Sequence, residues 1–179
     1  MTGTSGYYTY LISSLPMLHF GRSKPFSFEK FLDMCAQSVS ANDVEIIKSC
    51  AGIERSPYDD SQSALKKWHA FDTALRNALV KIRSARKHKD PDKYLRPDEY
   101  QNPHATNLAM NAYKNPSVLE SEKILDEARW RALDELTVGH HFDIDFLILY
   151  AHKLLILEKW DKVNAADKSR ILEETLQKG

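Results

Sequence analysis

Apolar residues recur every three or four positions along most of the chain, which is the period of an α-helix. The longest such run extends from about Ser61 to Arg86, and its apolar positions are Leu65, Trp68, Leu75, Leu79 and Ile82. Asp72 is the one polar residue that interrupts this face. The pattern predicts a long amphipathic helix that buries one side in a bundle.

Start and stop signals place the other helices. Ser27 precedes an apolar run at helical spacing, and Ser40–Asp43 has the S/T-x-x-D/E spacing that begins a helix. The segment Tyr7–Leu15 is aromatic, and its pattern fits a strand as well as a helix. We expect further helices near Ala105–Tyr113, after Asn115 or Ser117, from Asp143 to about Val163, and, as a last short one, in residues 164–179.

These elements predict an all-α protein, a bundle of about six to seven helices of which two or three are long and amphipathic. Only six glycines occur, and no run of alternating apolar residues is followed by an Asn-Gly turn. We expect residues 1–179 to form a single helical domain. Any boundary between subdomains is expected in the irregular segment 87–104, which contains three prolines.

The helix expected from Asp143 is more apolar than one buried face requires. One face carries Phe146, Leu147, Tyr150, Leu154, Leu157 and Trp160, and the neighbouring positions carry Ile148, Leu149, Leu155 and Ile156. An apolar arc of this width predicts that the helix either lies at the centre of the core or is covered by a partner.

The overall charge argues against a dedicated nucleic-acid binder. Lysine plus arginine equals aspartate plus glutamate at 25 each, whereas dedicated nucleic-acid binders usually carry a basic excess. One basic run, Lys81–Lys89, lies at the end of the long helix, where cations complement the helix dipole. A nucleic-acid or lipid adaptor that acts through Arg83, Arg86, Lys87 and Lys89 is the alternative explanation of this run.

The expected location of the protein is the cytoplasm. Cys35 and Cys50 are too few for a disulfide framework or a zinc ribbon, and they suit a reducing compartment as buried thiols. The first residues lack the pattern of a signal peptide, and no stretch reaches the roughly 20 apolar residues that span a bilayer. We therefore expect contact with a membrane only through a partner, and no nucleic-acid partner.

The stretch Gly139–Phe146, GHHFDIDF, is the strongest candidate for a metal site. His140, His141, Asp143 and Asp145 have side chains that bind zinc, iron or manganese, which would make the protein a metal-dependent hydrolase. However, no H-E-x-x-H motif and no adjacent His-Asp pair occurs. The favoured interpretation is a linker between two helices, in which Gly139 ends the first helix and Asp143 caps the second.

No other pattern indicates catalysis. The chain has no G-x-S-x-G nucleophile motif and no glycine-rich loop for binding phosphate, and neither cysteine has a histidine close by in sequence. We expect a non-enzymatic protein with no metal and no cofactor. Tyrosine and tryptophan side chains are typical anchors of protein interfaces. The residues predicted to contact a partner are Tyr7, Tyr8, Trp130, His140, His141, Tyr150, Lys153 and Trp160.

Three stretches of the chain resemble a known family. They are YYTYLISSLPMLHFGRSKPFSFEKFLDMC, FDTALRNALVKIRSARK and LDEARWRALDELTVGHHFDIDFLILYAHKLLILEKW. They are similar to signatures of a small bacterial family that is encoded among the subunits of V/A-type ATPases. The resemblance implies a non-enzymatic component of the central stalk, like the C (or d) subunit, that links the rotor shaft to the membrane ring. It implies other ATPase subunits as partners, a location on the inner face of the cell membrane, and no catalytic residues.

Overall fold

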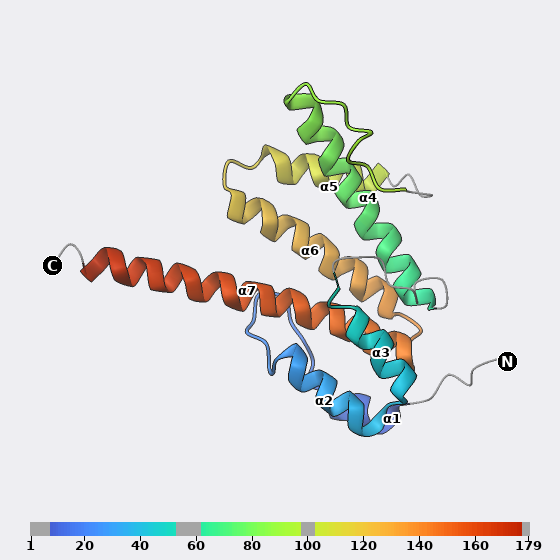
Figure 1. Ribbon diagram of the computed structural model, residues 1–179. Helices are drawn as coiled ribbons and strands as arrows, with labels where there is room; N and C mark the ends of the chain where they lie inside the picture. Colours follow the sequence, from blue (N-terminus) through green and yellow to red (C-terminus); the bar gives the residue numbers. More distant parts are fainter. Residues whose placement is uncertain (1–7, 53–61, 98–102, 177–179) are drawn as a thin grey trace. The chain divides into compact units, whose positions relative to one another are not determined.

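The structure, a computed structural model, describes residues 8–52, 62–97 and 103–176, with side chains described as far as residue 167 (Figure 1). These residues form seven helices and no strand. The prediction of an all-α protein is therefore confirmed. Three helices are long, as expected: α4 has 24 residues, α6 has 20 and α7 has 33.

The chain divides into two compact units. Unit 1 consists of residues 1–53 and 141–179, and unit 2 consists of residues 54–140 between them. The described parts of the irregular segment, residues 87–97 and 103–104, lie inside unit 2. The expectation of a single domain over residues 1–179 stays a prediction.

Unit 1 contains α1 (Thr9–Ser14), α2 (Phe28–Ser38), α3 (Ala41–Ser49) and α7 (Ile144–Leu176). The first aromatic segment is thus helical from Thr9 to Ser14. The predicted N-caps are confirmed, because the Ser27 hydroxyl accepts a hydrogen bond from the Lys30 N–H at 3.2 Å. The Ser40 hydroxyl accepts one from the Asp43 N–H at the same distance.

The first half of α7 forms the centre of unit 1. Both α2 and α3 pack against this helix. Every residue from 147 to 152 is buried, so the helix is covered around its circumference rather than on one face. The wide apolar arc is therefore explained over this half by burial within the chain itself.

The helix α7 continues without a break from Ile144 to Leu176, so the prediction of a separate last helix in residues 164–179 was wrong. The reason is the absence of a helix breaker, since no glycine or proline occurs between Ile144 and Lys178. Ala165 and Ala166, which have the highest helix propensity of any residue type, follow Asn164 directly. At 1.5 Å per residue, the helix is about 50 Å long.

Unit 2 contains α4 (Ser63–Arg86), α5 (Pro103–Lys114) and α6 (Val118–Thr137), which all contact one another. Alanines 105, 109 and 112 of α5 repeat at helical spacing and are at most 1% exposed. Their small side chains allow neighbouring helices to approach α5 closely. Larger residues of α4 and α6 complete this cluster, and they are Leu75, Leu79 and Leu125. The helix α6 begins at the predicted cap Ser117, whose hydroxyl accepts from the Glu120 N–H.

An ionic triad explains the polar interruption on the face of α4. The Arg129 guanidinium donates from Nε to Asp72 Oδ1 at 2.8 Å and from Nη1 to Asp126 Oδ1 at 2.9 Å. Burial lowers the pKa of Arg129, but the two carboxylates outweigh this effect, so the pKa is raised overall. Asp72 therefore joins α4 to α6 through a largely buried guanidinium that is paired with two carboxylates.

Candidate functional site

The linker between α6 and α7 has the geometry that the sequence predicts. Gly139 follows the last turn of α6 and has a φ of +91°. Residues with a Cβ rarely adopt this backbone conformation. The His140 N–H donates to the Thr137 carbonyl at 3.0 Å. Asp143 then accepts from the Phe146 N–H at 3.0 Å and caps α7. The chain passes from unit 2 to unit 1 between His140 and His141.

The four candidate metal ligands do not form a metal site in the described structure. His141 is exposed, His140 is half-buried, and Asp145 lies in the first turn of α7. A stable site requires three or four converging ligands. Within residues 8–52, 62–97 and 103–167, no three side chains of histidine, cysteine, aspartate or glutamate are placed to hold a metal ion. Among these residues the hydrolase interpretation has no converging set of ligands, and it stays an untested alternative.

Tyr8 connects the start of the chain to the linker and to α3. Its N–H donates to the Phe142 carbonyl at 2.6 Å, and its hydroxyl donates to the Asp43 carboxylate. Burial raises the pKa of Tyr8, and the Asp43 carboxylate raises it further. This predicted contact residue therefore already has partners within its own chain. Tyr7, the other predicted contact in this segment, lies outside the described residues.

Trp130 and Tyr150 are each only 6% exposed, so packing within the chain accounts for both side chains. The Tyr150 ring lies 5.2 Å from the Phe31 ring, and its hydroxyl donates to the Pro16 carbonyl at 3.0 Å. Burial raises the pKa of Tyr150 well above its usual value. Neither ring offers much surface to a partner in this conformation.

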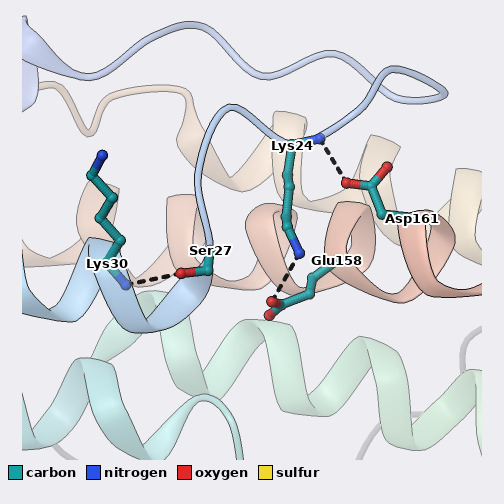
Figure 2. Close-up of polar contacts among 5 residues, drawn as sticks. All are labelled: Lys24, Ser27, Lys30, Glu158 and Asp161. Atoms are coloured by element: carbon teal, nitrogen blue, oxygen red, sulfur yellow. Dashed lines mark hydrogen bonds and ion pairs between the residues drawn. The ribbon is translucent and has the colours of Figure 1, made fainter.

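The loop before α2 is tied to α7 by two contacts of Lys24, which we name the Lys24 clasp (Figure 2). The Lys24 ammonium lies 3.0 Å from Glu158 Oε1, and its backbone N–H donates to Asp161 Oδ2 at 3.1 Å. Figure 2 shows the Lys24 side chain extending across the helix toward Glu158. The sequence does not reveal this pair, because more than 130 residues separate Lys24 from both carboxylates and no local pattern joins them.

The part of α7 from residue 158 onward, which we name the α7 extension, begins at the Lys24 clasp. No side chain from 158 to 167 is buried, in contrast to the fully covered residues 147–152. Figure 1 shows α7 continuing well past α2. Of the predicted contact residues, half-buried Trp160 lies in this extension, and half-buried Lys153 lies just over one turn before it. The α7 extension is the candidate surface for a partner.

The two cysteines are not placed for nucleophilic catalysis. Cys35 is fully buried, and Cys50 is 7% exposed. Burial raises the pKa of Cys35 to about 12, so the thiol is protonated near neutral pH and is a poor nucleophile. Both thiols lie in unit 1 and are buried, and burial is what the sequence predicts.

Comparison of the chain with protein-family models, curated proteins and solved structures gives no match. The resemblance of the three sequence stretches to an ATPase-associated family therefore stays a prediction. In the part of the chain that the structure describes, no helix combines the length and apolar character needed to cross a membrane.

Proposed function

We propose that the protein is a non-enzymatic subunit of a V/A-type rotary ATPase, a C- or d-like component of the central stalk that links the rotor shaft to the membrane ring. It would lie in the cytoplasm, on the inner face of the cell membrane, and would be held there through the complex. The proposal is supported by the three sequence stretches quoted above and by the all-helical fold.

The observation that supports a partner surface most directly is the contrast along α7. Its first half is covered by its own chain, and the α7 extension has no buried side chain as far as residue 167. Trp160 and Val163 in this extension are half-buried apolar residues whose surface a partner could cover further. An ordered helix that continues beyond its own core is suited to docking against another subunit.

Affinity purification of the tagged chain from its native host tests the proposal. We expect V/A-type ATPase subunits to be recovered with the wild-type chain. The double variant Trp160→Ala, Val163→Ala should recover at least about tenfold less, because loss of an aromatic anchor typically costs about 2 kcal/mol or more in binding. Recovery of no ATPase subunit by the wild-type chain would contradict the proposal.

A matched control separates loss of the surface from loss of fold. Val118 is 79% exposed in the first turn of α6, and Val118→Ala also removes apolar surface. We expect this variant to recover ATPase subunits as well as the wild-type chain does. Circular dichroism should show the same helix content for all three proteins. If Val118→Ala and the α7 variant lose recovery equally, the α7 extension is not the contact surface.

A further inference from the structure

A cluster of cations occupies the end of α4 and the turn that follows it in unit 2. We name it the α4 basic cluster, and it consists of Lys81, Arg83, Arg86, Lys87, Lys89 and Lys93. All six side chains are exposed. Asp90 and Asp92 are the only acids between residues 81 and 93, so six cations and two carboxylates give a local charge of +4. Because the whole chain has a net charge of 0, the remainder carries −4.

The backbone that carries the cluster is fixed by hydrogen bonds. His88 adopts a left-handed conformation with φ of +50°, and the Lys89 N–H donates to the Ser84 carbonyl at 3.0 Å. This bond closes the end of α4 in the manner of a Schellman motif. The turn beyond it is closed by the Tyr94 N–H, which donates to the Pro91 carbonyl at 2.9 Å.

The far end of the same segment is attached to the middle of α4. The Asn77 side chain, which is buried, donates to the Arg96 carbonyl at 2.9 Å and accepts from the Arg96 N–H at 3.0 Å. The segment therefore runs back beside α4, as Figure 1 shows. Cations of the turn and cations of the helix are thereby held on the same end of unit 2.

The helix dipole explains only part of this arrangement. Cations in the last turn of α4 are favourable there, but Arg83 is spaced three and four residues from Arg86 and Lys87. Like charges at these spacings destabilise a helix. No carboxylate of a described residue forms an ion pair with any member of the cluster. A ligand with several negative charges would remove this repulsion.

We propose that the α4 basic cluster binds the anionic phospholipid headgroups of a membrane surface. Lysines near such a surface each contribute attraction without requiring a specific geometry, and four of the six cations are lysines. Tyr94, which is 53% exposed within the same turn, has the side chain that is enriched at the boundary between headgroups and acyl chains. This proposal does not depend on the ATPase function. It gives the chain a direct contact with the membrane, in addition to the contact made through partner subunits.

A nucleic acid fits the same features less well. Arginine is the preferred residue for bidentate phosphate contacts, and Arg86 already donates from Nη1 to the Tyr113 hydroxyl at 3.2 Å. A nucleic acid follows an extended basic groove, whereas the rest of this chain is acidic overall. A flat anionic surface needs to touch only the end of the unit that carries the cluster.

Sedimentation with large vesicles tests the proposal. We expect the full chain to bind vesicles of phosphatidylcholine with phosphatidylserine, and not vesicles of phosphatidylcholine alone. Binding should weaken as salt is raised, because salt screens the attraction. Each lysine near an anionic surface contributes about fivefold, so Lys87→Gln, Lys89→Gln, Lys93→Gln should weaken binding about 100-fold. Tyr94→Ala should weaken binding severalfold. Its control is Tyr10→Ala, which removes a tyrosine that is 92% exposed in unit 1 and should leave binding unchanged.

The charge-matched control is Lys66→Gln, Lys67→Gln, Lys123→Gln, which changes three exposed lysines of unit 2 outside the cluster. This variant should bind phosphatidylserine vesicles almost as well as the wild-type chain does. The proposal would be overturned by equal losses in the two triple variants. Failure of the wild-type chain to bind phosphatidylserine vesicles at low salt would also overturn it, as would tighter binding to a duplex DNA or RNA oligomer than to these vesicles.

Discussion

The two units bury their polar groups in different ways. Unit 2 is one continuous segment, and it contains the triad in which Arg129 is bonded to Asp72 and Asp126. Unit 1 is assembled from both ends of the chain around α7. It buries neutral groups such as the Cys35 thiol and the Tyr150 hydroxyl, and its Lys24–Glu158 ion pair stays 24% and 18% exposed, whereas Asp126 of the unit 2 triad is only 3% exposed. Among the described side chains, those of α7 in unit 1 form a long helix whose residues 158–167 lie past the core of the unit and are not buried. We propose that the α7 extension of unit 1 contacts the ATPase partner, whereas unit 2 carries the α4 basic cluster on a fold joined by the Arg129 triad.

Breaking the triad of unit 2 should have the largest effect on stability. Arg129→Met leaves two carboxylates without their cation, and we expect a loss of about 3–5 kcal/mol in the free energy of unfolding. Hydrogen exchange followed by mass spectrometry should show that Arg129→Met raises the exchange rate above the wild-type value more in α4 and α6 of unit 2 than in α7. Arg131→Met is the control, because that side chain is 71% exposed and pairs with Glu127 of its own helix. Equal effects of the two substitutions would contradict the assigned role of the triad.

The two halves of α7 should respond differently to truncation. Leu154 is fully buried, and Leu154→Ala should lower the free energy of unfolding by about 2–5 kcal/mol through loss of apolar contacts and formation of a cavity. Val163→Ala, in the half-buried α7 extension, should cost less than about 1 kcal/mol in the isolated protein. Urea denaturation of the two variants measures the difference. Similar losses would show that the extension is as well packed as the first half.

High pH should weaken unit 1 through its buried thiol. The pKa of Cys35 is raised from 9.0 to about 12 in the fold, so its protonated form stabilises the protein fully below pH 9. That stabilisation is lost as pH rises from 9 toward 12, because the unfolded chain releases the proton first. Between pH 9 and pH 10 the loss from this group should be about 1 kcal/mol. Urea denaturation of Cys35→Ala over this interval should show a shallower decline than the wild-type protein, and an identical decline would contradict the prediction.

Removal of the Lys24 side chain should have a modest effect. Its ammonium pairs with Glu158, and the side chains are 24% and 18% exposed, so Lys24→Ala should cost about 0.5–1 kcal/mol. The backbone bond to Asp161 remains in this variant. Lys24→Ala should raise the rate of hydrogen exchange in the α7 extension. The control Lys30→Ala, at an exposed position on α2, should leave that rate unchanged. Unchanged exchange in Lys24→Ala would show that the clasp does not hold the helix.

Substitution of the linker histidines should have the smallest effect. We expect His140→Ala and His141→Ala to reduce stability or partner binding slightly, without removing any metal from the protein. Elemental analysis of purified wild-type protein and both variants measures the metal content. Stoichiometric zinc, iron or manganese that disappears in either variant would restore the hydrolase interpretation.

Local structure could be predicted from the sequence because its signals act over a few residues. The caps Ser27, Ser40 and Asp143 and the stop at Gly139 each depend on one side chain or one backbone angle. The continuity of α7 could not be predicted as readily, because Asn164 weakens a helix only slightly and the packing around it is not visible in the sequence.

Long-range pairs and the exposure of aromatic residues could not be predicted. Arg129 is 57 residues from Asp72, and no periodicity within a helix indicates which helix will lie opposite. Residue type alone predicts Trp130 and Tyr150 as partner contacts, yet both are buried. An aromatic residue fills a core or an interface by the same physics, so only the fold distinguishes the two.

Site-specific cross-linking from the α7 extension tests the central claim most directly. A photoreactive amino acid in place of exposed Lys162 should cross-link the chain, in its native host, to a V/A-type ATPase subunit. The same amino acid in place of Lys30, which is exposed on α2, should give little or none of that product. Cross-links from position 162 that contain no ATPase subunit would contradict the account.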